Sequence, residues 1–166
     1  MYMSQEKGRL FSIDLEHQNF GKNFTRSGDL WYFNSKDYVF DSHSERVSNK
    51  NNTIVTINKF AKQVIYDQNF NNTFDIFDVL SNADSEVIVL SSFIEKELIR
   101  TNFFLAQWDM NGSIWTIQNT GEPKKISIII SSNETLELEI SSSKIIPTSS
   151  LPYIDISEYE IIDLRE

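Results

Sequence analysis

Alternating apolar and polar positions run along most of the chain and predict β-strands. Residues 10–16 alternate strictly, which indicates a strand with one buried face. Residues 53–60 are strand-like and can pair with residues 63–67, whereas the apolar, β-branched residues 85–93 predict a buried strand. Residues 42–52 are polar and predict a loop.

Residues 29–42 predict a hairpin whose polar turn is the run from Asn34 to Asp37. This turn would place Trp31 opposite Phe40. The same turn would place Phe33 opposite Tyr38.

The segment FFLAQWDMNGSIWTIQNTG, residues 103–121, carries two tryptophans placed symmetrically about an Asn-Gly pair. Asn-Gly favours a type I′ turn because both central residues need a positive φ. With Asn111 and Gly112 as the loop, Trp108 pairs directly with Trp115. Both rings would then share an apolar face, so we expect them to be core residues.

Residues 125–141 predict a further hairpin. A loop at residues 132–134 makes Ile128 face Leu138, and the outer face then carries Glu137 and Glu139. Two carboxylates at a spacing of two on a strand point to the same side. The hairpin would therefore have one apolar face and one acidic face.

Helical spacing appears at residues 71–84, where Thr73 can cap a short helix and Phe74, Phe77 and Leu80 would share a face. Residues 91–102 and 157–165 fit either a helix or a strand. The pattern predicts a β-dominated α+β fold, with antiparallel hairpins forming a sandwich or a half-barrel and one or two short helices. We expect a single globular domain, residues 1–166.

The chain of 166 residues is 40% hydrophobic and contains no cysteine. A disulfide or a cysteine-ligated metal site is therefore excluded, and the fold depends on packing, which suits a reducing compartment. The first residues contain no apolar run typical of a secretory leader. These features together predict a cytoplasmic protein.

The net charge of −9 is unevenly distributed, with +2 on residues 1–62 and −11 on residues 63–166. A negative surface repels nucleic-acid phosphates and disfavours anionic membranes, and it favours a basic protein partner. Solubility alone is the simpler explanation for such a charge. The oligomeric state does not follow from the sequence.

No phosphate-binding, metal-binding or nucleophile-elbow motif occurs, so we expect no cofactor, no metal and no enzymatic activity. The histidines, His17 and His43, have carboxylates nearby in the sequence. A hydrolase that uses His43 or His17 with carboxylates is therefore one alternative.

Acidic side chains follow the last predicted hairpin and continue in the C-terminal segment. If that segment lies beside the hairpin, these carboxylates form one anionic surface that could bind a partner. The candidate partner-binding residues are Glu134, Glu137, Glu139, Asp155, Glu158, Glu160 and Asp163.

In its small size, acidity, lack of cysteine and predicted β-content, the chain resembles the immunity proteins of bacterial toxin–immunity pairs, including contact-dependent growth inhibition systems. Residues 101–119 also look like a central hairpin found in some of them. The resemblance implies a binding protein that occludes the active site of a cognate basic toxin, often a nuclease.

A second hypothesis is a small-ligand-binding β-barrel. The phrase GDLWY, residues 28–32, resembles the element that opens a lipocalin barrel, although its spacing differs by one residue. In this hypothesis Trp31, Phe33, Trp108 and Trp115 surround an apolar cavity.

Overall fold

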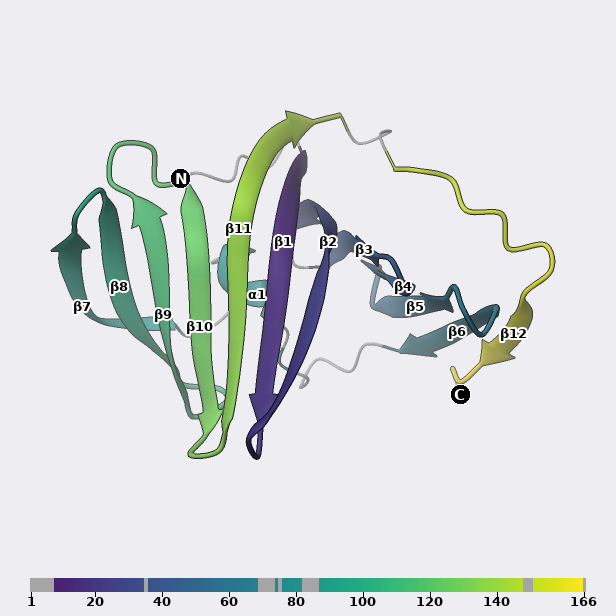
Figure 1. Cartoon of the computed structure of the whole chain (residues 1–166), viewed down its shortest axis with the longest axis horizontal. Helices are drawn as coiled ribbons and strands as arrows, with labels where there is room; N and C mark the ends of the chain where they lie inside the picture. The colour runs from purple at the N-terminus through teal and green to yellow at the C-terminus, as the bar shows by residue number, and fades with distance from the viewer. Residues whose placement is uncertain are drawn as a thin grey trace. The chain divides into compact units, whose positions relative to one another are not determined.

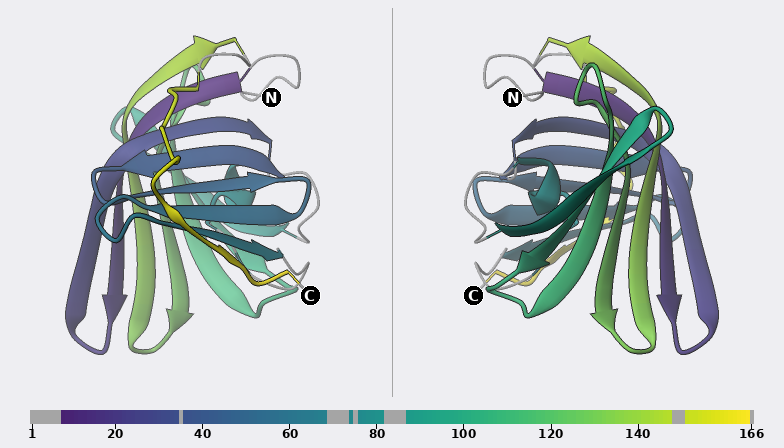
Figure 2. Two further views of the ribbon diagram at one scale, coloured as in Figure 1. Left: turned by 90° about the vertical axis from the view of Figure 1, so that its right-hand side faces the viewer. Right: turned by 90° about the vertical axis from the view of Figure 1, so that its left-hand side faces the viewer.

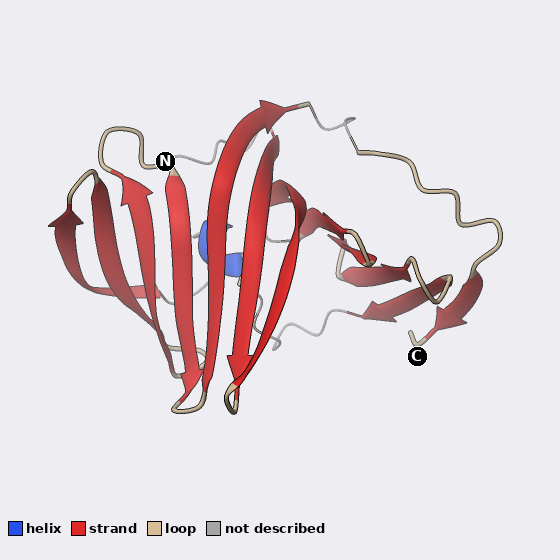
Figure 3. Cartoon of the chain, in the orientation of Figure 1, coloured by secondary structure: helices blue, strands red, loops and turns tan. Residues whose placement is uncertain are grey.

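The computed structural model describes residues 8–34, 36–68, 74, 76–81, 87–147 and 151–165, and most of them lie in strands (Figure 3). Its single described helix is α1, Asp78–Ser81. The strands are β1 (Gly8–Asn19), β2 (Lys22–Asn34), β3 (Asp37–Ser42), β4 (Glu45–Lys50), β5 (Thr53–Asn58), β6 (Gln63–Gln68), β7 (Val87–Glu95), β8 (Leu98–Leu105), β9 (Met110–Ile117), β10 (Pro123–Ser131), β11 (Glu134–Ile146) and β12 (Glu160–Asp163).

The twelve strands form one open sheet in the order β12-β6-β5-β4-β3-β2-β1-β11-β10-β9-β8-β7 (Figure 1). The pairings from β2 to β6 and from β7 to β11 are antiparallel, whereas β12 runs parallel to β6. The fold is thus β-dominated and antiparallel, as predicted. The predicted sandwich is wrong, because the described strands belong to one open sheet rather than to two packed layers.

The described part of the chain divides into two compact units. Unit 1 comprises the described residues within the ranges 13–26 and 74–142. Unit 2 comprises the described residues within the ranges 8–12, 27–68 and 143–165. The expectation of a single domain over residues 1–166 stays a prediction.

The sheet of unit 1 has one apolar face and one polar face. We call "apolar face" the side that carries Phe103, Leu105, Ile126, Ile128 and Leu138, all at most 2% exposed. The strand registers place these side chains together, since Phe103 pairs with Gly112, and Gly112 with Ile128. Alternation along each strand puts the opposite set of residues on the second side, which we call the polar face.

The residues that surround α1 supply apolar cover within unit 1. Ile76, Phe77 and Leu80 are all buried, and Phe74 packs edge-on against Trp108 with ring centroids 5.4 Å apart. In Figure 1 the helix lies on one side of the sheet, behind β10 and β11. We infer that this segment covers the apolar face. The predicted short helix is therefore confirmed, although only four residues long, and Thr73 lies outside the described residues.

In unit 2, β2 and β3 carry buried side chains at consecutive positions. Leu30, Trp31 and Tyr32 are each at most 7% exposed, and so are the three residues Tyr38, Val39 and Phe40. On one side, Trp31 and Val39 form a cluster with Ile146 and the partly buried Leu10 and Phe33. Because both sides of these strands are covered, simple alternation is lost there.

The predicted hairpin at residues 29–42 is present as β2 and β3, but its register differs by one residue. Trp31 pairs with Val39 and Tyr32 with Tyr38, because the register shifts between Tyr32 and Asn34. Such a β-bulge adds one residue to one strand, so a register predicted by counting back from the turn is wrong by one residue.

The prediction of a polar loop at residues 42–52 is wrong, since β4 occupies residues 45–50 and pairs with both β3 and β5. This strand is polar because its side chains form specific contacts. One of them is the ion pair between Arg46 Nη2 and Asp41 Oδ2, at 2.6 Å. The prediction of β5 and β6 as partner strands is confirmed.

The predicted Asn-Gly turn is also wrong. Residues 106–109 connect β8 to β9, Asp109 has the positive φ of 54°, and Leu105 pairs with Met110. Gly112 lies inside β9, where an added Cβ would lie 2.5 Å from Phe103 Cζ and 2.7 Å from Ile128 Cδ1. Glycine is thus required for packing at this position, and Trp115 pairs with Arg100 instead of Trp108.

The hairpin predicted at residues 125–141 exists, with its register shifted by two residues. Ile128 pairs with Leu136 and Ile126 with Leu138. A shift of two keeps every side chain on the predicted face. The two ambiguous segments are both extended, as residues 91–102 form the end of β7, a turn and β8, and the C-terminal segment contains β12.

Replacing Gly112 by alanine should destabilise the protein by about 1–3 kcal/mol, because the new methyl group overpacks the space that Phe103 and Ile128 fill. Thermal unfolding measures this as a fall in Tm of roughly 2–4 °C per kcal/mol. The control is Asn111→Ala, an exposed neighbour on the same strand, which should change stability by less than about 0.5 kcal/mol. Equal effects of the two substitutions would contradict the packing argument.

Candidate functional site

The apolar face of unit 1 is covered unequally along the sheet. Towards β10 and β11 its side chains are buried, whereas on the edge strand β7 Val89 is 63% exposed and Ile94 is 67% exposed. Both belong to this face, because Val89 pairs with the buried Phe103 and Ile94 pairs with Ile99. The apolar face of unit 1 is therefore buried in its middle strands and exposed to solvent at the β7 edge.

The exposure of β7 corrects the prediction of a buried strand at residues 85–93. The strand is present, but it pairs only with β8 and ends the sheet, so its apolar side chains lack a neighbour on one side. Its large side chains that are at least half exposed are Ile88, Val89, Leu90, Phe93 and Ile94. Val89 and Ile94 lie on the apolar face, whereas Ile88 and Phe93 pair with Phe104 and Arg100 on the opposite face. Exposed apolar side chains that share one face are typical of a binding surface.

The bulge in β7 affects what this edge can bind. The register of β7 against β8 shifts between Val89 and Ser91. A bulge interrupts the row of backbone groups that an added strand would need, and it is one of the devices that protect an edge from strand pairing. The edge is better suited to a ligand that contacts side chains than to another β-strand.

Side-chain contacts around Trp115 connect neighbouring strands on the polar face of unit 1. Its ring lies 5.0 Å from the Arg100 guanidinium carbon and 5.8 Å from Lys125 Nζ. Its Nε1 donates to Glu95 Oε2 at 3.1 Å. These distances fit cation–π contacts, so Trp115 belongs to the polar face and not to the core.

The four aromatic residues named in the ligand-barrel hypothesis are divided between the two units. Trp31 and Phe33 belong to the cluster of unit 2. Within unit 1, Trp108 lies in the turn after β8 and Trp115 lies on the polar face. Trp108 Nε1 is buried and has no hydrogen-bond partner within the described structure.

Three of the predicted partner-binding carboxylates lie in unit 1, and each is engaged within the chain. Glu137 and Glu139 accept bonds from Lys125 Nζ at 2.9 and 3.4 Å. The hydrogen bond to Glu137 raises the pKa of Lys125 against the opposing effect of burial, with further contributions from Glu139. Glu134 accepts a 2.7 Å bond from His17 Nε2.

The other four predicted carboxylates lie in unit 2. Glu158 pairs with Lys62 at 2.9 Å, and Glu160 accepts a bond from the Gln63 side chain at 2.9 Å. Bonds from the side chain and backbone of Arg165 lower the pKa of Asp163 to about 2. Bonds from Ser157, the largest from its backbone, lower the pKa of Asp155. Glu158 and Glu160 thus tie the C-terminal segment to Lys62 and to Gln63 at the start of β6, whereas Asp155 and Asp163 form bonds within the segment itself.

The two histidines lie in different units. His17 contacts Glu134 and lies 6.4 Å from the Phe24 ring, whereas His43 packs edge-on against Phe60 with centroids 5.3 Å apart. Within the described ranges, no group of three or more His, Asp or Glu side chains is placed to hold a metal ion.

Unit 2 contains one tight charge network. Asp41 accepts bonds of 2.6 Å from both Arg46 Nη2 and Lys59 Nζ, and Lys59 also donates to the Ser42 carbonyl. Arg46 reaches the Pro152 carbonyl at 2.7 Å. Burial alone would raise the pKa of Asp41, but the bonds and charges of Arg46 and Lys59 outweigh it and lower that pKa. The network joins β3, β4 and the C-terminal segment.

Among the described residues, no helix has the length and apolar character needed to cross a membrane.

No protein-family model and no curated protein matches the chain. Among solved structures, an uncharacterized conserved protein from Thermus thermophilus matches with a TM-score of 0.60 at 5% identity, over 95% of this chain and 91% of that one. A putative outer membrane lipoprotein-sorting protein domain from Vibrio parahaemolyticus matches at 0.49, with 8% identity over 91% and 89%. A LolA superfamily protein from Nitrosomonas europaea matches at 0.42, with 9% identity over 93% and 90%.

These matches correct the resemblance to toxin-immunity proteins, which is wrong. The similar solved structures include proteins described as LolA superfamily and lipoprotein-sorting proteins. The prediction of a cognate toxin as partner rested on that resemblance and is wrong as well. The resemblance was one of composition, and a small acidic β-rich chain is compatible with many folds. At these identities, the similarity to the Thermus protein shows a shared fold.

The Asp41 network predicts a specific pH dependence of stability. Because the pKa of Asp41 is lower in the folded protein, its contribution is complete above the unfolded value near 3.8 and is lost as pH falls through the folded value. Asp41→Asn should cost about 1–3 kcal/mol at neutral pH and should flatten the acid limb of a Tm–pH curve. The exposed control Asp109→Asn should leave that limb unchanged. An acid limb that is identical in Asp41→Asn and the unmodified protein would refute this assignment.

Proposed function

We propose that the chain is a non-enzymatic binding protein for a long apolar ligand of the acyl-chain class, which lies on the apolar face of unit 1 along β7. The observation that carries the proposal is the exposure of Val89 and Ile94 on the same face as the buried Phe103 and Leu105. A ligand placed there would complete a core that the chain itself leaves open.

The shape and chemistry of this strip suit an acyl chain. From Val87 to Ile94 the strand extends about 20 Å. Side chains on the same face in the neighbouring strands, Ile99 and Ile114, are only half-buried and would widen the contact. No charged residue lies at these positions, so neither the chain nor the ligand would leave an unpaired charge there.

The expected affinity follows from the area that a ligand could bury. Each buried methylene contributes about 0.8 kcal/mol. About ten methylenes would therefore contribute roughly 8 kcal/mol, which corresponds to a micromolar Kd before the cost of association is subtracted. We expect binding in the micromolar range or weaker.

Titration with a fluorescently labelled undecanoic acid tests this proposal. We expect saturable binding at one site per chain. Ile94→Asp and Val89→Asp should each weaken it at least tenfold, because a carboxylate on the apolar face must be desolvated. The matched control is Ile129→Asp, since Ile129 is 52% exposed but pairs with Asn111 and Thr135 on the polar face.

Equal effects of Ile94→Asp and Ile129→Asp would contradict the assignment to the apolar face, and so would the absence of saturable binding. Sedimentation of the same variants distinguishes a second occupant. A dimer that Ile94→Asp dissociates, without any ligand binding by the unmodified protein, would show that β7 instead contacts another copy of the chain.

A further inference from the structure

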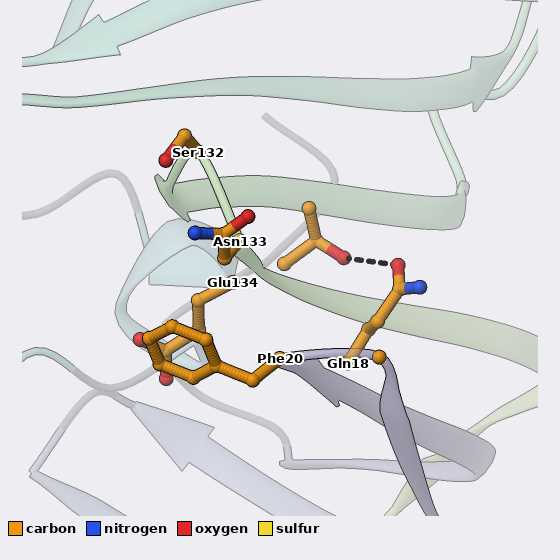
Figure 4. Close-up of a pocket in the computed structure, with 7 residues that line it drawn as sticks. Gln18, Phe20, Ser132, Asn133 and Glu134 are labelled. Atoms are coloured by element: carbon orange, nitrogen blue, oxygen red, sulfur yellow. Dashed lines mark hydrogen bonds between the residues drawn. The ribbon is translucent and has the colours of Figure 1, made fainter.

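Two hairpin tips of unit 1, the β1–β2 turn and the β10–β11 turn, lie side by side at the same end of the sheet (Figures 1 and 2). Phe20 N donates to the Asn133 carbonyl at 3.0 Å, and Thr135 Oγ1 donates to Gln18 Oε1 at 3.4 Å. These bonds fix one tip against the other. A half-open pocket of about 410 Å³ lies between the two tips, and none of the roles assigned above uses it (Figure 4).

Phe20 is placed in this turn at an energetic cost. It has a φ of 46° and is followed by Gly21 at 75°, so both central residues of the turn lie in the left-handed region. Such a turn favours Asn-Gly, and a bulky side chain at positive φ is strained. The ring is nevertheless 78% exposed, so it contributes little to the core. Strain at an exposed aromatic residue points to a role in binding.

The pocket combines this ring with uncharged hydrogen-bonding groups and one carboxylate. In Figure 4 the Phe20 ring and the polar side chains border the same space. The polar lining residues are Gln18, Ser132, Asn133, Glu134 and Thr135. Amides and hydroxyls both donate and accept, and the Glu134 carboxylate retains acceptor sites beyond the one bonded to His17.

The lining contains no lysine and no arginine, which disfavours a phosphate or carboxylate ligand. A sugar ring has complementary chemistry, because its hydroxyls both donate and accept while its C–H face packs on an aromatic ring. The volume lies within the range of small-ligand pockets.

We propose that this two-hairpin pocket binds an uncharged saccharide, with Phe20 as the stacking platform. The pocket is a second site, separate in its residues from the β7 strip. Its ligand can be a free saccharide or the sugar of a larger glycoconjugate, which share the same chemistry.

The test is a set of ¹H–¹⁵N NMR titrations of the full chain with methyl glucoside, maltose and N,N′-diacetylchitobiose. We expect saturable shifts confined to residues around 18–21 and 132–135 for at least one saccharide. Glucose 6-phosphate should bind at least fivefold more weakly than the uncharged sugar of the same ring. A glycolipid presented in neutral vesicles, compared with the same vesicles without it, separates the conjugated source from the free one.

Phe20→Asn is the informative variant, because asparagine suits the left-handed turn. It should raise Tm by about 2–4 °C while weakening saccharide binding at least tenfold. Phe60→Ala, which removes another exposed ring (70%) in unit 2, should leave saccharide binding unchanged. Fatty-acid binding at β7 should be the same in the unmodified protein, Phe20→Asn and Phe60→Ala. A negative result for saccharide binding therefore leaves the proposal for β7 unaffected, and the reverse also holds.

Absence of saturable shifts with every saccharide would overturn the proposal. So would saccharide binding that survives Phe20→Asn. Binding to sugar-free vesicles that is lost in Phe20→Asn, without any saccharide binding, would assign the exposed ring to a lipid surface instead and would also overturn it.

Discussion

The unequal cover of one apolar sheet face is the constraint on which the rest of unit 1 depends. A sheet with an apolar side must bury it, and the short segment around α1 covers only part of the width. Phe103 and Leu105 on β8 are buried, whereas Val89 and Ile94 on β7 are not. The transition occurs between neighbouring strands, and it separates the part of the face that stabilises the fold from the part available to a ligand.

The polar face is exposed to solvent, and contacts between its own side chains must hold its strands in place. Trp115 lies between two cations, and its indole N–H is bonded to Glu95. The Ser113 hydroxyl donates to the Asn102 side chain across β8 and β9. Such cross-strand pairs each contribute roughly 0.2–1 kcal/mol and hold the sheet in register. A sheet supported on this side can leave part of its other side uncovered.

The sequence predicted the strands well where one face is apolar and the other faces solvent, as in β1 and the β10–β11 hairpin. The sequence-based prediction was wrong where a contact with a distant segment determines the local structure. Gly112 looked like a turn residue, but its lack of a side chain makes room for Phe103 and Ile128. Residues 45–50 looked like a loop because the partners of Arg46 lie in other segments.

The candidate site was largely out of reach of sequence reasoning. The run VIVL in β7 is the same whether the strand is central or at an edge, and only the strand order shows that its side chains are exposed. The acidic residues stood out in the sequence because charge is easily counted, yet their in-chain partners, such as Lys62 for Glu158, are far away in sequence. Phe20 could have been noticed, since NFGK between two strands places a phenylalanine in a tight turn.

Hydrogen–deuterium exchange with and without a saturating medium-chain fatty acid tests the central claim most directly. Amide exchange reports local opening, and an edge strand with exposed apolar side chains should open readily when empty. The account predicts slower exchange in β7 and in its neighbour β8 when the ligand is present, with no change in β5, β6 and β12. Protection confined to unit 2, or none in β7 at saturation, would contradict it.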